Sequence, residues 1–124
     1  MEQQVRNFKE LKVWKAGIEI ALKTYELTRK FPKHEVYGLG SQMQRCSISI
    51  PSNIAEGQQR KTSKEFSHFL RISLGSLAEL QTQLLISKEL NYITIEDMDK
   101  LEPELEQERK MPFLLIHSLK IENN

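Results

Sequence analysis

Lysine and arginine residues are clustered in this sequence in a way that could bind a nucleic acid. They lie in two groups, namely Arg60, Lys61, Lys64 and Arg71 near the middle of the chain and Lys12 and Lys15 near its start. Such cations neutralise the phosphates of a nucleic acid and release bound counterions. Few aromatic residues are available to stack on bases. The pattern therefore predicts weak, salt-sensitive binding of RNA or DNA with little sequence preference.

A row of polar residues follows one side of the segment 41–59. Its members recur at spacings of four, four, three and four residues and are Arg45, Ser49, Asn53, Glu56 and Arg60. Polar side chains beside an apolar face are typical of a buried hydrogen-bond network that holds neighbouring helices in register. If the next helix is antiparallel, Arg45 lies opposite Glu79, and we expect a bidentate ion pair between them. The alternative is a ligand-binding groove along this row.

The patterns of catalytic and metal sites are missing from the sequence. His34, His68 and His117 are isolated, with no second ligand at metal-binding spacing. Cys46 lies on an apolar helix face, which predicts an inert buried thiol. The carboxylates between Glu102 and Glu108 form a run that is typical of a solvated acidic surface. We therefore expect no enzymatic activity, no metal and no cofactor.

Four helical segments must position these side chains. The segments cover residues 9–30, 41–59, 63–90 and 95–120. Apolar residues recur in them at helical spacing, and no stretch alternates as a strand does. Thr62 with Glu65 and Thr94 with Asp97 form capping patterns at the start of the third and fourth segments. Short connections favour antiparallel neighbours, so the sequence predicts one all-α domain, an up-down four-helix bundle over residues 1–124.

Three prolines lie inside these segments. Pro51 cannot donate a hydrogen bond to the carbonyl group of Ser47, so we expect a kink in the second helix. Close packing is expected just after it, at Ala55 and Gly57, because small residues let two backbones approach. Pro103 and Pro112 lie in the fourth segment, which we expect to be bent or broken once.

Two of the segments carry more apolar residues than one core face needs. In the first segment, Leu11, Ile18 and Tyr25 are expected to face the core. The residues left over in the first segment are Val13, Ile20 and Leu27, at seven-residue spacing. The core face of the third segment is flanked by Leu74 and Leu85 on one side and by Ile72, Ile86 and Leu90 on the other. Scattered exposed apolar residues are common, but surplus apolar residues on two helices indicate further contacts. We expect a homo-oligomer whose interface uses Val13, Ile20, Leu27, Leu74 and Leu85.

The composition is that of an ordinary globular domain. Of its 124 residues, 39% are hydrophobic and 28% are charged, which argues against disorder. A single cysteine, no apolar run of membrane-spanning length and no export signal predict a cytoplasmic protein without a membrane partner. Residues 1–75 carry 13 Lys and Arg against 7 Asp and Glu, and residues 76–124 carry 5 against 10. This asymmetry fits either packing of oppositely charged helices or a nucleic-acid surface.

Five short segments, found in one order along the chain, carry a family resemblance. They are Phe8-Lys-Glu-Leu-Lys-Val-Trp14, Phe31-Pro-Lys-His-Glu35, Gln42-Met-Gln-Arg45, Ser49-Ile-Pro-Ser-Asn-Ile-Ala-Glu-Gly57 and Gly75-Ser-Leu-Ala-Glu-Leu80. In these segments the sequence resembles the four-helix-bundle family of 23S rRNA-intervening-sequence proteins. The resemblance implies a ring-like homopentamer. Similar bundles are accessory proteins of diversity-generating retroelements, which bind a reverse transcriptase and nucleic acid through a basic surface.

Two functions remain open from the sequence. The first is a nucleic-acid-associated accessory factor that binds RNA, or a reverse transcriptase, through the basic residues. The second is a structural scaffold or protein-interaction module with no nucleic-acid role.

Overall fold

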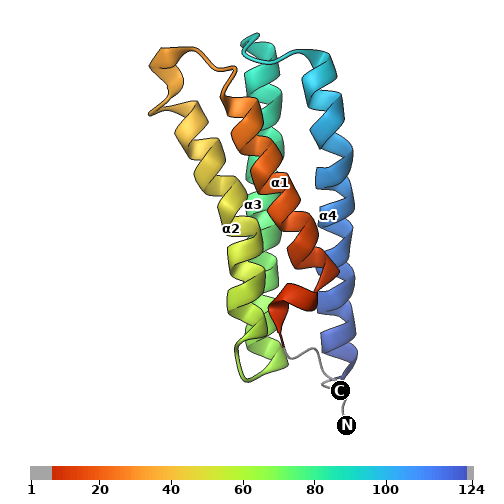
Figure 1. The fold of residues 1–124 in the computed structure, drawn as a ribbon. Helices are drawn as coiled ribbons and strands as arrows, with labels where there is room; N and C mark the ends of the chain where they lie inside the picture. The colour runs from red at the N-terminus through yellow and green to blue at the C-terminus, as the bar shows by residue number, and fades with distance from the viewer. Residues whose placement is uncertain (1–6, 123–124) are drawn as a thin grey trace.

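The computed structural model describes residues 7–122 and consists of four long helices. They are α1 (Lys12–Thr28), α2 (Leu39–Gln58), α3 (Ser63–Glu89) and α4 (Ile95–Glu122), with short 3-10 turns η1 (Phe8–Glu10) and η2 (Lys33–Glu35). Successive helices lie side by side and run in opposite directions along the bundle (Figure 1). No strand occurs within residues 7–122. The prediction of an all-α fold with four helices is confirmed.

The helices begin and end where local side-chain chemistry satisfies the free backbone groups. The Thr62 hydroxyl accepts a hydrogen bond from the Glu65 backbone N–H at 3.1 Å, which starts α3. Thr94 and Asp97 bond reciprocally at 3.0 Å, each side chain accepting from the other's backbone N–H, at the start of α4. Such caps stabilise a helix by about 1 kcal/mol each. Asn91 follows α3 with a φ of 63°, the left-handed conformation that asparagine tolerates better than most residues.

The face of α1 that packs into the bundle differs from the one expected, although Leu11, just before the helix, is partly buried against the core. Val13, Ile20 and Leu27 are 5%, 0% and 8% exposed and belong to the core, whereas Tyr25 is 39% exposed. Assigning them to an oligomer interface was therefore wrong. Gly17 is the physical reason, because it lies between Val13 and Ile20 on the buried face.

Close packing at Gly17 brings α1 against α2. A Cβ atom at this position would lie 3.2 Å from the Cβ of Pro51, so a larger residue would force the helices apart. Thr24, also buried on this face, satisfies its hydroxyl by donating to the Ile20 carbonyl at 2.8 Å. The buried side of α1 is therefore indicated by Gly17 and by Thr24, whose hydroxyl bonds within its own helix, and less well by a large residue such as Tyr25.

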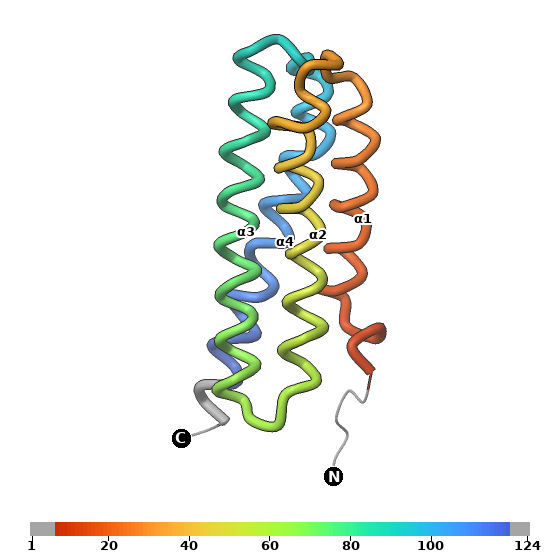
Figure 2. Tube along the Cα trace, turned by 90° about the vertical axis from the view of Figure 1, so that its left-hand side faces the viewer, coloured from red at the N-terminus to blue at the C-terminus, as the bar shows by residue number. Residues whose placement is uncertain are grey.

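Close approach also joins α2 to α3 at Gly57. A Cβ atom there would lie 2.7 Å from the Cβ of Phe69 and 3.0 Å from Cδ1 of Phe66, so the expected tight packing at this glycine is confirmed. Figure 2 shows α2 between α1 and α3 in the side view. The core also takes apolar residues from all four helices, among them Met43, Ile50, Leu70, Leu77, Leu84, Leu101, Leu105 and Ile116.

The prolines do not interrupt the helices. Pro51 is buried within α2, which is one helix from Leu39 to Gln58, and the size of any bend at Pro51 stays a prediction. Pro103 and Pro112 lie inside α4, which is also one helix. The fourth helix was expected to be bent or broken once, and the structure excludes the break, whereas a bend stays a prediction. Packing offsets the lost backbone hydrogen bond at Pro112, which is itself fully buried.

A carboxyl group is buried in the middle of α4. Glu108 is 0% exposed, and neither of its carboxyl oxygens has a hydrogen-bond partner in the described part of the chain. A Cβ atom built on Gly17 would lie 3.3 Å from Glu108 Oε2, which places the carboxyl group against α1. Burial raises the pKa of Glu108 to about 8, so the group is mostly protonated at neutral pH. The interpretation of this segment as uniformly solvated was wrong at Glu108.

Replacing Gly57 by alanine should destabilise the fold. The added methyl group meets the Cβ of Phe69, which cannot move away as the end of a flexible side chain could. We expect the free energy of unfolding in urea to fall by about 1–3 kcal/mol, even though alanine favours helix formation. Ser52→Ala, on the exposed side of the same helix, is the control and should change stability by less than about 0.5 kcal/mol. Equal effects would contradict the packing described at Gly57.

Replacing Glu108 by leucine should stabilise the fold and remove a pH dependence. The folded pKa of Glu108 lies above that of an exposed glutamate. Below about pH 4.5 the Glu108 carboxyl group is protonated in both the folded and the unfolded chain, and it does not lower stability by ionising. Above that pH the free energy of unfolding falls by about 1.4 kcal/mol per pH unit, until the pH reaches the folded pKa. Urea unfolding from pH 5 to 8 should show this slope in the native sequence and lose it in Glu108→Leu. Glu89→Leu, at an exposed position of α3, should keep it.

Candidate nucleic-acid interface

The helix order brings the two predicted groups of basic residues to one end of the bundle. In Figure 1 the connection between α2 and α3 forms the lower end of the bundle, and α1 starts in the lower part, above that connection. We call the exposed cations at this end the basic rim, and its members are Lys12, Lys15, Arg60, Lys61 and Lys64. Arg71 is exposed further along α3. Sequence spacing gave two separate groups, and the opposite directions of successive helices join them.

Arg60 is the one rim residue held by other side chains. Its Nη2 atom donates to Glu56 Oε2 at 2.7 Å, and its guanidinium carbon lies 4.9 Å from the centre of the Phe69 ring. The ion pair is solvent-exposed, so it fixes the side chain more than it stabilises the fold. Glu56 therefore belongs to the rim surface, and its assignment to a buried network was wrong.

The other rim cations remain available to a ligand. Among the described residues, Lys61 and Lys64 form no ion pair, and the same holds for Lys12 and Lys15 at the start of α1 and for Arg71. Glu10 and Glu65 lie at the same end and reduce the positive charge, although Glu65 is engaged at the Thr62 cap. The rim therefore carries a modest excess of positive charge.

The acidic residues of α4 lie away from the rim residues of the α2–α3 connection. The segment from Glu102 to Glu108 falls in the half of α4 nearer its start, and α4 starts at the opposite end of the bundle (Figure 1). Glu104 forms an ion pair with Lys23 of α1, and Glu106 accepts a hydrogen bond from Gln81 of α3 at 2.9 Å. These carboxylates thus connect α4 to its neighbours and do not line the surface formed by Lys61 and Lys64.

The expected ion pair between Arg45 and Glu79 does not form. Both residues are exposed, and no ion pair joins them within the described part of the chain. Glu79 instead accepts a hydrogen bond from Gln83 Nε2 at 3.3 Å.

The Cys46 thiol is buried near Glu79. Burial, together with the charge of Glu79, raises the pKa of the Cys46 thiol to about 12, which agrees with the prediction of an inert buried thiol.

Short hydroxyl side chains take the place of that ion pair between α2 and α3. The hydroxyl of Ser49 donates to that of Ser76 at 2.6 Å, and the hydroxyl of Ser73 donates to the Ile50 carbonyl at 2.7 Å. Asn53 donates to the Ser49 carbonyl at 2.8 Å, which is a bond within its own helix. The helices are too close for a long side chain to lie between them, so arginine faces solvent. The serines of α3 were missed because they fall outside the polar row of α2.

Exposed apolar side chains gather on α3. Leu85 is 48% exposed, as expected of a residue beside the core face, whereas Leu74 is partly buried against the core. Ile72, Ile86 and Leu90 are 39%, 44% and 49% exposed on the same helix. The surplus apolar surface predicted on the third helix therefore exists at Ile72, Leu85, Ile86 and Leu90, and Leu74 is the exception.

Comparison with known proteins identifies the family. The family described as 23S rRNA-intervening sequence protein matches residues 9–113. The chain belongs to this family. The basic rim and the serine contacts between α2 and α3 both lie within the matched region. No curated protein matches the chain.

A solved structure has the same fold. It is the 1.70 Å crystal structure of a protein with unknown function from the S23 ribosomal protein family of Bacteroides thetaiotaomicron VPI-5482. The two chains are 23% identical and superpose with a TM-score of 0.78 over 84% of this chain and 97% of the other. At this identity the likeness concerns the fold alone.

Neither a membrane-spanning helix nor a metal-binding cluster occurs in the described residues. No helix there is long and apolar enough to cross a membrane. No group of three or more His, Cys, Asp and Glu side chains within residues 7–122 is arranged to hold a metal ion.

Proposed function

We propose that this member of the 23S rRNA-intervening sequence protein family is a non-enzymatic accessory factor that binds the RNA backbone in the cytoplasm. The observation that carries the proposal is the basic rim, where cations from α1 and from the α2–α3 connection share one end of the bundle without acidic partners for most of them. The family description, which refers to ribosomal RNA, supports RNA as the nucleic acid.

The chemistry of the rim suits a phosphate backbone more than individual bases. Lys61 and Lys64 are flexible point charges that can contact phosphates in many orientations. Phe69, the aromatic ring that contacts the rim residue Arg60, is covered by it on one face and so offers little to a stacking base. The expected binding depends on salt and tolerates any sequence.

Neutralising the rim should weaken RNA binding. We expect Lys61→Gln with Lys64→Gln to reduce affinity for a single-stranded RNA oligonucleotide by about tenfold at low salt. The slope of log affinity against log salt should fall by about 1–2, because two phosphate contacts are lost. A filter-binding titration at several salt concentrations measures both quantities.

A matched double variant at the other end serves as the control. Arg29→Gln with Lys33→Gln removes the same charge from exposed positions beyond the end of α1. It should leave the affinity within about twofold of the unchanged protein. Equal losses of affinity in both double variants would mean that RNA responds to the net charge of the protein and not to the rim. If the unchanged protein binds no RNA, a scaffold role becomes the better-supported function.

We also propose that the protein assembles with copies of itself through the outer face of α3. The exposed Ile72 and Ile86 support this surface, as does Gly75, where an added Cβ would meet no atom within 4 Å. An exposed glycine inside a helix costs about 1 kcal/mol and has no packing role within this chain. Its lack of a side chain lets a second copy approach closely. The number five rests on the family resemblance.

Placing a charge on this face should dissociate the assembly. Light scattering should give about five times the 14.5 kDa mass of one chain for the unchanged protein and the mass of one chain for Ile86→Glu. In the assembled protein the carboxylate of Ile86→Glu would be buried in the interface without a partner of opposite charge, so this variant should stay a single chain. Leu22→Glu, at a 60% exposed position of α1, is the control and should keep the assembled mass. Dissociation by Leu22→Glu alone would place the interface on α1.

A further inference from the structure

Phe113 of α4 is a large aromatic side chain that the fold leaves in water. It is 62% exposed, and among the described residues its ring contacts no other ring and no cation. Phe69, by contrast, lies under the guanidinium group of Arg60. A single exposed apolar residue is common in globular proteins, so the role of Phe113 depends on what surrounds it.

The register of α4 against α3 places Phe113 beside α3. Glu106 of α4 accepts a hydrogen bond from Gln81 of α3 at 2.9 Å. Phe113 follows Glu106 by seven residues, which is two helical turns, so it lies on the same side of α4. Leu74 precedes Gln81 by seven residues on α3, and the two helices run in opposite directions (Figure 1). Phe113 and Leu74 therefore lie at the same level of the bundle, on neighbouring sides of the two helices.

Unpaired cations surround this ring. Arg71 lies one turn from Leu74 on α3, and Lys110 lies one turn from Phe113 on α4. Both cations are exposed, and within residues 7–122 neither forms an ion pair. Lys64 lies two turns before Arg71 on the same side of α3, so it connects this surface to the basic rim. We call Phe113, Arg71 and Lys110 the aromatic patch.

Acidic side chains do not balance the charge of the aromatic patch. No Asp or Glu occurs in residues 66–78 of α3 or in residues 109–120 of α4. Glu106, two turns before Phe113, is paired with Arg109 at 3.1 Å. Glu108 is buried on the core side of α4 and mostly protonated at neutral pH. The patch therefore combines an exposed ring with a local excess of positive charge.

This combination fits a single-stranded RNA better than a second copy of the chain. Two copies that met at this face would bring like charges together, whereas phosphates are attracted to it. An aromatic ring stacks on any base, because every base has a π-face, and nearby cations follow the backbone. The bases of a duplex stack on one another, so they are not free to stack on a protein side chain.

We propose that Phe113 stacks on one base of a single-stranded RNA while Lys110 and Arg71 bind the flanking phosphates. This inference rests on the proposed function and adds to it the kind of RNA that is bound. The strand runs from Lys64 at the rim along α3 to the aromatic patch. Arg71, which lies apart from the rim, thereby gains a role in the same surface.

The test compares a single-stranded RNA oligonucleotide with the duplex of the same sequence in filter-binding titrations of the full chain. Phe113→Leu keeps an apolar side chain but removes the ring. It should weaken single-strand binding by about tenfold and leave duplex binding within about twofold. The slope of log affinity against log salt should not change, because no cation is lost. Phe113→Trp, which restores a ring, should restore the single-strand affinity.

Leu114→Ala is the matched control, because Leu114 is 64% exposed on another side of the same helix. It should leave both affinities unchanged, and circular dichroism should show the same helix content in all variants. An unchanged single-strand affinity in Phe113→Leu, or an equal loss in Leu114→Ala, would overturn the stacking role and leave backbone binding at the rim in place.

Two other results would count against a larger part of the proposal. A lower assembled mass of Phe113→Leu in light scattering would identify the aromatic patch as a contact between copies and would overturn its role in RNA binding. Failure of the unchanged protein to bind either RNA would contradict the proposed function, and this inference with it.

Discussion

The close approach of α2 to its two neighbours is the constraint on which the rest of the structure depends. Gly17 of α1 meets Pro51, and Gly57 meets Phe66 and Phe69 of α3, at separations that leave no room for another methyl group. At these separations the helices can be joined only by short side chains, and serine hydroxyls fill that role between α2 and α3. Long polar side chains on α2 must then point outward.

That constraint explains which parts of the molecule were predictable from sequence. Helix number, helix ends and the caps at Thr62 and Thr94 depend on local chemistry, and the sequence predicts them well. The core face of α1 depends on what packs against it. Two apolar stripes on that helix satisfy the same helical period, and the choice between them rests on Gly17, whose importance appears only when Pro51 is seen opposite.

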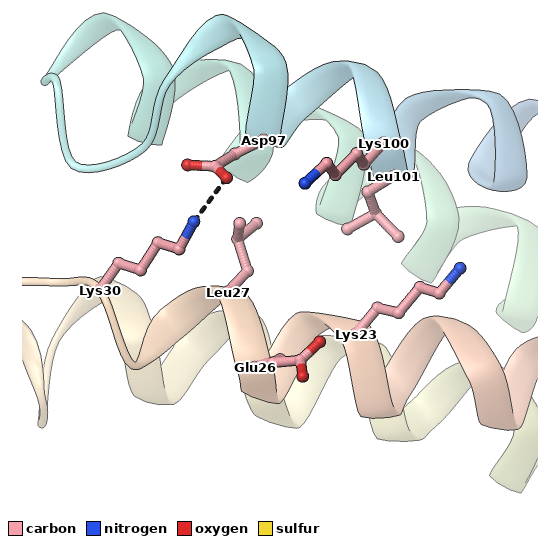
Figure 3. Close-up of a pocket in the computed structure, with 7 residues that line it drawn as sticks. All are labelled: Lys23, Glu26, Leu27, Lys30, Asp97, Lys100 and Leu101. Atoms are coloured by element: carbon pink, nitrogen blue, oxygen red, sulfur yellow. Dashed lines mark hydrogen bonds and ion pairs between the residues drawn. The ribbon is translucent and has the colours of Figure 1, made fainter.

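The candidate sites show the same division between local and long-range information. The basic residues were predicted individually, but their union into one rim depends on the direction of each helix. Arg45 and Glu79 were placed near the same contact between helices, yet their orientation required knowledge of how close the helices lie. The pocket between α1 and α4, lined by Leu27, Leu101 and Lys100 among others (Figure 3), had no sequence pattern, because its leucines look like ordinary core residues and its lysines like ordinary surface residues.

The buried carboxyl group of Glu108 has a consequence for the charge of the whole molecule. The formal net charge of +1 counts every glutamate as ionised, whereas a mostly neutral Glu108 makes the folded chain almost one unit more positive at neutral pH. The unfolded chain loses this proton to the buffer. The heat of unfolding at neutral pH therefore contains the ionisation heat of the buffer, and calorimetry in phosphate and in Tris will give different values for the same conformational change.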